Sequence, residues 1–175
     1  MNKLLEIAEL GQPVLWNIAM SVDHIDKDTL TLIDDMKFTV GKVNGVGLAA
    51  PQVFHSKRIF IIASKPSVRY PSAPLMEPEA IVNPVIREMS ESKIKDWEGC
   101  LSIPGIRGYV PRSESIEVEY MNEKGELVQK TFNGFLARVF QHELDHLEGI
   151  VFLDRMETGK DLITENEFQK IILSK

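Results

Sequence analysis

Disulfide chemistry is excluded within this chain, because its 175 residues include a single cysteine, Cys100. That scarcity fits a reducing compartment. No apolar run approaches the roughly 20 residues that cross a bilayer, so no membrane association is expected. Lys and Arg number 20 against 26 Asp and Glu. The net charge of -6 disfavours general attraction to nucleic acid, and we expect no specific DNA binding.

Targeting signals are also missing from the first residues, MNKLLEIAEL. They lack the apolar core and small-residue cleavage site of a secretory signal, and the arginines of an organelle-targeting peptide. We therefore expect a cytoplasmic protein. The length, with 43% hydrophobic and 26% charged residues, is typical of one globular unit, so we expect a single domain over 1–175.

Three stretches have the apolar spacing of amphipathic helices. Residues 28–43 place apolar side chains on one stripe, with Asp28 as the expected capping residue. The stretch 135–149, FLARVFQHELDHLEG, has a clear pattern, and Gly149 suits the position just past a helix end. A weaker pattern over 161–172 predicts a final helix.

Four stretches have the apolar runs or the alternation that are typical of strands: 58–64, 80–86, 115–121 and 127–132. The last two should form a hairpin, and Pro84 should put the second at a sheet edge or a bulge. Residues 65–80, with four prolines, predict a surface loop, and residues 88–96 a turn or exposed strand. We expect an α+β fold in which small antiparallel sheets surround the 135–149 helix, with helices at both ends.

An H-E-x-x-H motif lies inside the 135–149 helix, at His142, Glu143 and His146. Four residues apart on a helix, the two histidines share one face. Two imidazoles placed in this way can bind one metal ion, and Glu143 beside them is a candidate general base.

A second informative stretch, GVGLAAPQ, runs from Gly45 to Gln52. It matches a G-x-G-x-x-A dinucleotide fingerprint, which requires a preceding strand and a helix that starts within it. A helix-like segment precedes it instead, and Pro51 obstructs a helix. We therefore expect a loop or strand whose glycines let the backbone approach another group closely, with Gln52 as its functional polar side chain.

The spacing of residues in the sequence does not identify the third metal ligand. Catalytic zinc-type sites usually have three protein ligands and one open position. An extended H-E-x-x-H motif needs histidine at position 152, where this chain has Phe152. The remaining candidates are a downstream carboxylate, Glu165 or Glu167, and the thiolate of Cys100.

Three segments together resemble the signatures of the peptide deformylase family. They read GVGLAAPQ at 45–52, EGCLS at 98–102 and QHELDHLEG at 141–149, and the likeness extends over about residues 11–155. Departures are small; Phe54, for example, stands where many members have glycine. The resemblance implies hydrolysis of the N-formyl group from nascent polypeptides that begin with formylmethionine, with release of formate.

The resemblance also implies roles for the site residues. Cys100, His142 and His146 would hold the metal, and a metal-bound water would attack the formyl carbon. Glu143 would accept the proton of that water and deliver a proton to the leaving amine, as general acid and base. The Gln52 amide and the backbone N–H of Leu101 would stabilise the oxyanion.

The expected substrate is a formylmethionyl nascent peptide in an extended form. By resemblance, its backbone would pair near Val46, Gly47 and Gly99. Its methionine side chain would enter an apolar pocket near Val139 and His142. A tight space beside the metal would admit a formyl group and exclude an acetyl group. The ribosome is a further expected partner.

The expected cofactor is one divalent metal ion. A Cys-His-His site accepts zinc, iron, nickel or cobalt by ligand type. The resemblance points to Fe²⁺ as the native ion, with Zn²⁺, Ni²⁺ or Co²⁺ able to substitute. Glu98 and Asp145 are candidates for orienting the ligands.

Two alternative functions need consideration. One is an H-E-x-x-H metalloendopeptidase with Glu165 or Glu167 as its third ligand. The other is a non-enzymatic, metal-stabilised binding module associated with the ribosome. Glu143 argues against the second alternative, because a structural metal site needs no base and is normally closed by four protein ligands.

Overall fold

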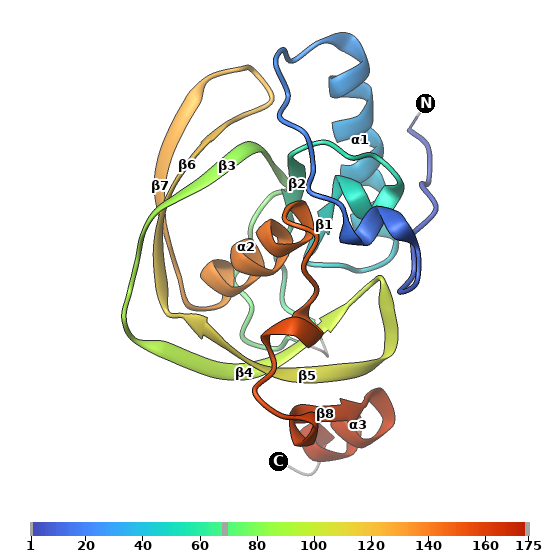
Figure 1. Ribbon diagram of the computed structural model, residues 1–175, viewed down its shortest axis with the longest axis vertical. Helices are drawn as coiled ribbons and strands as arrows, with labels where there is room; N and C mark the ends of the chain where they lie inside the picture. Colours follow the sequence, from blue (N-terminus) through green and yellow to red (C-terminus); the bar gives the residue numbers. More distant parts are fainter. Residues whose placement is uncertain (1, 68–69, 174–175) are drawn as a thin grey trace.

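The protein folds as predicted into an α+β structure in which two antiparallel sheets lie around one helix (Figure 1). The structure, a computed structural model, describes residues 2–67 and 70–173. Both ends of the expected 1–175 domain, residue 1 and residues 174–175, therefore lie outside the described residues. In chain order the elements are η1 (Pro13–Trp16), α1 (Lys27–Lys42), β1 (Gly47–Ala49), η2 (Ala50–Val53), β2 (Ile59–Ile62), β3 (Glu79–Met89), β4 (Lys93–Cys100), β5 (Ile103–Ser113), β6 (Ser115–Met121), β7 (Leu127–Asn133), α2 (Gly134–Leu147), η3 (Phe152–Arg155), η4 (Gly159–Asp161), β8 (Leu162–Thr164) and α3 (Glu165–Leu173).

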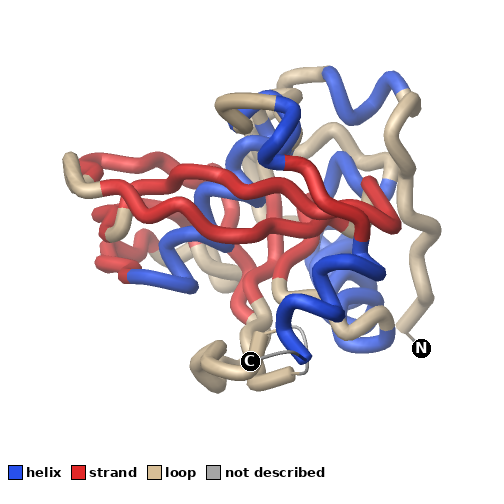
Figure 2. The backbone as a smooth tube through the Cα atoms, turned by 90° about the horizontal axis from the view of Figure 1, so that it is seen from below, coloured by secondary structure: helices blue, strands red, loops and turns tan. Residues whose placement is uncertain are grey.

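The strands divide into a five-stranded and a three-stranded sheet. The larger sheet has the order β1-β2-β3-β6-β7, and the smaller has the order β4-β5-β8. In Figure 1, α2 (orange) lies in the middle, with β6 and β7 to one side and β4 and β5 below it. The helix α3 (red) lies on the far side of β4 and β5 from α2. Seen from below, the strands form a broad layer with helices above and below it (Figure 2).

The predicted strands of the larger sheet are present, and β6 pairs with β7 as the expected hairpin. The prediction of a bulge at Pro84 is confirmed, because the register of β3 against β6 shifts between Val82 and Val85. The alternative of an edge position is wrong, since β3 pairs with both β2 and β6. Asn83 has a positive φ of 50° in the bulge, and its side chain bonds both backbone polar groups of Val22, at 2.9 and 2.8 Å.

The sequence predicted the smaller sheet only in part. The expectation of a turn or exposed strand over 88–96 is met, because 90–92 connect β3 to β4 and the first residues of β4 are mostly exposed. The long antiparallel pairing of β4 with β5 was not predicted. Glycine and proline in EGCLSIPGIRGY hide the usual strand alternation. The start of the predicted final helix is also corrected, because Leu162–Thr164 is a strand that pairs with β5.

The first helix, α1, begins one residue earlier than predicted and has a different cap. The Asp26 carboxylate accepts a hydrogen bond from the Thr29 backbone N–H at 2.7 Å, so Asp26 and not Asp28 is the capping residue. The predicted apolar stripe is confirmed, since Ile33 and Met36 are almost fully buried.

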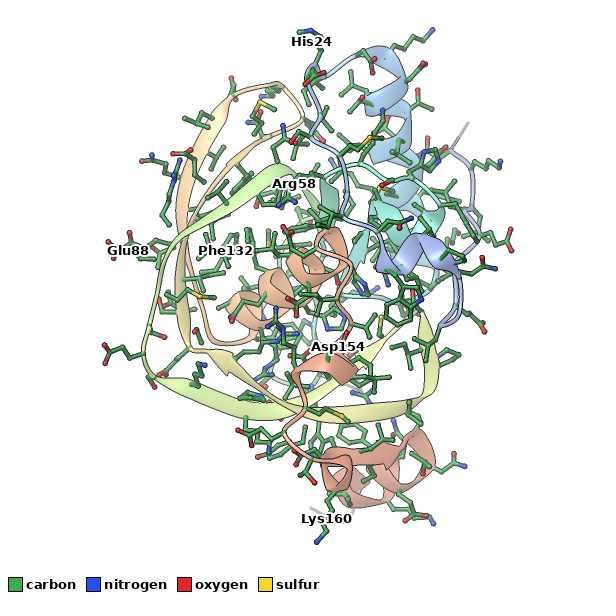
Figure 3. All side chains as sticks on the ribbon, viewed as in Figure 1. His24, Arg58, Glu88, Phe132, Asp154 and Lys160 are labelled. Atoms are coloured by element: carbon green, nitrogen blue, oxygen red, sulfur yellow. The ribbon has the colours of Figure 1, made fainter. Side chains whose placement is uncertain are left out.

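One part of the core lies between α2 and the larger sheet, and another lies between α1 and the same sheet. Phe140 from α2 contacts the Phe60 ring edge-on at 5.0 Å between centroids and the Phe132 ring at 5.5 Å. Figure 3 shows Phe132 in the interior, whereas His24 and Glu88 point away from the protein. One face of α2 therefore anchors the fold, which leaves the opposite face for chemistry.

We expect Phe60→Ala to lower the free energy of unfolding by about 3–5 kcal/mol, because a fully buried ring leaves a cavity. Urea denaturation measures this change. Leu127→Ala is the control: Leu127 is 66% exposed, and its loss should change the free energy by less than about 0.5 kcal/mol. Similar effects for the two variants would contradict this assignment of the core.

Candidate active site

The helix α2 positions the two predicted histidines. It ends after Leu147, and Gly149 has the left-handed φ of 69° expected just past a helix end. His142 and His146 lie one turn apart, with ring centroids 5.1 Å from each other. Both are buried, with 9% and 1% of their surface exposed. The predicted shared face is therefore confirmed, and it points into the protein.

Cys100 completes the group of possible metal ligands. It is the last residue of β4, and its Sγ lies 3.3 Å from Nε2 of His146. The ligand atoms of Cys100, His142 and His146 all lie within 4.8 Å of one another. The alternative third ligands point elsewhere: the Glu165 carboxylate accepts hydrogen bonds from Arg107, and Glu167 is exposed.

The chemistry of this group fits a divalent transition metal. One thiolate and two imidazoles are the donors that such ions prefer. Burial lowers the pKa of His146 well below its usual value, and the charge of Arg112 acts in the same direction, which favours the neutral, ligating imidazole. Two buried atoms, His146 Nδ1 and Glu143 Oε2, have no hydrogen-bond partner among the described residues. Buried polar atoms are rarely unsatisfied, so these atoms suit a site built for further polar contacts.

Glu98 fixes the ring of one of the candidate ligands. Its Oε2 lies 2.9 Å from Nδ1 of His142, which leaves Nε2 of that ring for a metal. Arg112 donates two hydrogen bonds to the same carboxylate, at 2.8 and 3.0 Å, and Arg138 donates one at 2.8 Å. Although burial raises the pKa of Glu98, the hydrogen bonds from His142 and Arg112 outweigh it and hold the pKa well below its usual range. Glu98 is therefore an anion in a buried cluster of positive groups.

Asp145, the second candidate for orienting ligands, contacts Arg112 through its carboxylate and, among the described residues, none of the candidate ligands directly. Its carboxylate binds Arg112 at 2.6 Å and Arg155 at 2.7 and 3.1 Å. The prediction of a ligand-orienting role thus changes to support of Arg112, which in turn holds Glu98. Sequence reasoning missed Arg112 and Arg138, because an isolated arginine carries no pattern that indicates burial.

The candidate base Glu143 lies against the glycine-rich stretch. A Cβ added to Gly47 of β1 would lie 2.2 Å from Oε1 of Glu143. This confirms the expectation that a glycine in this stretch permits a close approach. Glu143 is 4% exposed, and burial raises its pKa to about 7. A carboxyl group with such a pKa can both take up and release a proton near neutrality.

Gln52 is fixed at the other side of Cys100. Its Oε1 accepts a hydrogen bond from the Ala49 backbone N–H at 2.8 Å. Its Nε2 donates to Ser102 Oγ at 3.1 Å and lies 3.4 Å from Cys100 Sγ. Leu101 lies in the turn between β4 and β5. The amide is therefore a rigid donor beside the ligand group and not a surface side chain.

The ligand group lies at a cleft with a volume of about 210 Å³. All the predicted peptide-binding residues line it, namely Val46, Gly47, Gly99 and Val139. Cys100, His142 and Glu143 also line it. Three further lining residues, Tyr70, Arg107 and Glu165, were not singled out as contacts for a peptide. The structure thus brings the predicted residues together in one concave site.

Known proteins are similar in sequence to this chain over most of its length. A family model described as "Polypeptide deformylase" matches residues 4–161. The chain belongs to the peptide deformylase family. "Peptide deformylase 2" from Nostoc sp. is 52% identical over 171 residues, which cover 97% of this chain and 96% of that relative. "Peptide deformylase 2" from Shewanella oneidensis is 42% identical over 166 residues, 95% of this chain and 92% of that relative.

A solved deformylase has the same fold. The crystal structure of a class I type b peptide deformylase from Acinetobacter baumannii, with Met-Ala-Ser bound, superposes with a TM-score of 0.87. It is 45% identical in sequence, and the match covers 89% of this chain and 100% of that one. The fold class and the family resemblance predicted from the sequence are therefore confirmed.

Membership of the deformylase family decides the reaction class. These enzymes are metal-dependent hydrolases that remove the N-formyl group from nascent peptides. The endopeptidase and the non-enzymatic binding module are thereby set aside. Phe54, where the family resemblance led us to expect glycine, has a left-handed φ of 64°, a conformation that glycine adopts without strain. None of the described helices is both long and apolar enough to span a membrane.

We expect Gly47→Ala to lower kcat/KM by about 100-fold, because the new Cβ displaces Glu143 and misplaced catalytic groups lose rate steeply. Bound metal, measured by elemental analysis, should stay at the parent level. Gly41→Ala is the matched control, since a Cβ at that exposed position meets nothing within 4 Å. Parent-level activity in Gly47→Ala would show that Glu143 tolerates displacement.

We expect Glu98→Gln to weaken metal affinity by about 10- to 100-fold, because an amide holds His142 less firmly than a carboxylate. Competition with a chromogenic chelator measures the affinity, and thermal melting shows whether the variant folds. Glu114→Gln, an exposed change elsewhere in the chain, is the control. A folded Glu98→Gln protein with parent affinity would remove the orienting role.

Proposed function

We propose that Cys100, His142 and His146 form the metal site at which this chain hydrolyses the formyl group of formylmethionyl peptides. The products are formate and a free amino terminus. The observation that supports this proposal is the convergence of three ligand atoms within 4.8 Å, with Glu143 beside them in a buried cleft. Family membership supports the same reaction.

The three ligands would hold one divalent ion, and we propose Fe²⁺ as the native one, with Zn²⁺, Ni²⁺ or Co²⁺ able to substitute. Such an ion, when bound, lowers the pKa of water toward neutrality and polarises a carbonyl oxygen. The thiolate of Cys100 and the neutral imidazole of His146 suit all four ions. Comparing the activity of protein loaded with each ion, under anaerobic conditions for iron, tests the choice.

Glu143 acts as the general acid and base. Its carboxylate takes the proton of the attacking water and passes a proton to the amine that leaves. The raised pKa of Glu143, about 7, suits this exchange, and a bound cation would lower it. The backbone of Gly47 holds the carboxylate in place, because Oε1 occupies the space of a missing Cβ.

Gln52 and Leu101 stabilise negative charge on the formyl oxygen. The Gln52 Nε2 group is fixed by its hydrogen bond to Ser102, and the second N–H of this nitrogen, which lies 3.4 Å from Cys100 Sγ, is the one that would donate to the formyl oxygen. The backbone N–H of Leu101 is the second donor, in the residue directly after the ligand Cys100. Each such donor contributes roughly 3 kcal/mol to lowering the barrier in other hydrolases.

The peptide binds as an added strand. Since β1 is the terminal strand of the larger sheet, an extended chain can pair with it near Val46 and Gly47. Gly99 lines the cleft with them and supplies backbone groups for the other side of the peptide. Val139 lines the pocket for the methionine side chain. The Met-Ala-Ser bound to the Acinetobacter relative supports a peptide of this kind.

Two finer expectations belong to the proposal. A cytoplasmic location suits Cys100, because a thiolate ligand persists in a reducing compartment. A nascent chain as substrate makes the ribosome a reasonable partner, and this stays a prediction that co-sedimentation of the enzyme with translating ribosomes would test.

We expect the iron-loaded parent to release formate from formyl-Met-Ala-Ser and to leave acetyl-Met-Ala-Ser intact. Glu143→Gln should lower kcat by at least about 100-fold while it retains metal, since general base catalysis contributes that much. Cys100→Ala should lose the metal. Glu148→Gln, the same chemical change just past the end of α2, is the control and should keep parent activity.

Three outcomes would count against parts of this proposal. A metal-loaded, folded parent that releases no formate would overturn the reaction. Full turnover in Glu143→Gln would remove its role in proton transfer. Equal rates for formyl and acetyl peptides would refute the tight space beside the metal.

A further inference from the structure

The segment after residue 161 reaches the cleft although the family match ends there. Its strand β8 extends the smaller sheet, with Ile106 opposite Thr164 and Arg107 opposite Ile163. The next residue, Glu165, begins α3 and lines the cleft. A part of the chain beyond the region shared with the family model thus contributes to the wall of the site.

This segment holds Arg107 from two sides. The Glu165 carboxylate accepts hydrogen bonds from Nε of Arg107 at 2.7 Å and from Nη2 at 3.3 Å. The guanidinium carbon lies 4.0 Å from the centre of the Phe168 ring and 5.5 Å from that of Tyr70. Paired with a carboxylate and stacked on an aromatic ring, the guanidinium is fixed in one orientation. Only 1% of Arg107 is exposed.

The fixed guanidinium lies beside the backbone that we propose pairs with the peptide. A Cβ on Gly99 would lie 3.7 Å from both Cγ and Cζ of Arg107 and 3.8 Å from Nε. Gly99 in turn precedes the ligand Cys100. Arg107 therefore packs directly against a strand residue that we propose pairs with the peptide, and Glu165 is joined to it through the ion pair.

The alternation of side chains along a strand selects the peptide residue that meets this ion pair. Successive side chains of an extended peptide point to opposite faces, so the first and third residues share a face. Arg107 and Glu165 line the same cleft as Val139, whose pocket takes the methionine in first position. With the methionine in the pocket at Val139, the third residue lies on the same face of the peptide, and Arg107 and Glu165 line the cleft that this face would contact.

We propose that the Arg107–Glu165 pair, held in place by α3, determines which side chains the enzyme accepts at the third position of the formylated peptide. This inference rests on the proposed function, because it assigns a selectivity to the same cleft. The Glu165 carboxylate offsets the guanidinium charge, so that acidic and basic third residues are treated more alike than Arg107 alone would allow.

The test compares formyl-Met-Ala-Glu with formyl-Met-Ala-Lys, by kcat/KM, in the parent and in Glu165→Gln. The variant leaves the Arg107 charge less compensated and should shift the ratio toward the acidic peptide by about fivefold, the upper range for a charge on a solvent-exposed peptide side chain. Arg107→Gln should shift the ratio toward the basic peptide. The two variants should shift the ratio of kcat/KM values in opposite directions, so the test can be made with either variant if the other does not fold.

Glu167→Gln is the matched control, because it makes the same change on the same helix at an exposed residue that pairs with Lys170. It should leave the ratio at the parent value. Peptides with Glu or Lys in second position should show a smaller shift than the third-position pair. A general structural role would lower all rates together and would not reorder the peptides by charge.

A change in the ratio of less than about twofold in folded Glu165→Gln and Arg107→Gln proteins would overturn the proposal. So would an equal shift for second-position and third-position peptides. Formate release by the parent from formyl-Met-Ala, which has no third residue, tests the deformylase activity apart from the third-position selectivity. If the metal-loaded parent releases none, the proposed function fails; if it does and the ratios stay constant, the selectivity assignment alone fails.

Discussion

One buried negative charge, the carboxylate of Glu98, determines how the smaller sheet and the central helix are arranged. Glu98 comes from β4, and its partners come from β5 (Arg112) and from α2 (Arg138 and His142). Taking such groups out of water costs several kcal/mol for each ion, and the cost is offset only where every partner approaches correctly. We infer that this cluster selects one relative position of sheet and helix, and that this position brings Cys100 to the histidines.

The helix α2 serves the core and the site at once. Phe140 packs against aromatic rings of the larger sheet, and His142 and His146 face Cys100. Because the helix is buried on both sides, its two histidine rings have little freedom to reorient. The site is therefore organised before any substrate arrives, as a reaction that relies on fixed donors requires.

Short-range patterns in the sequence predicted much of this arrangement. The helix spacing of His142 and His146, the glycine at position 47 and the hairpin of β6 and β7 are local signals, and the structure agrees with each. Cys100 remained one of several possible third ligands until the family resemblance was considered, because its approach to the helix depends on tertiary structure. The resemblance, rather than periodicity, indicated its role.

What the sequence could not predict depends on contacts between distant segments. The strands β4 and β5 contain glycine and proline where alternation would be expected, and cross-strand pairing overrides those local preferences. Arg112 and Arg138 look like ordinary surface residues until their buried partner is known. The contact of α3 with Arg107 joins β5 to a helix that follows more than fifty residues later, and no local pattern encodes it.

The close contact between Gly47 and Glu143 has a consequence for how this enzyme can evolve. Every amino acid other than glycine would bring a Cβ into the space that the carboxylate oxygen fills. Glycine is thus the one amino acid that fits at position 47 for as long as Glu143 is retained. A substitution at position 47 is therefore open only after residue 143 has changed, although the two residues lie far apart in the sequence.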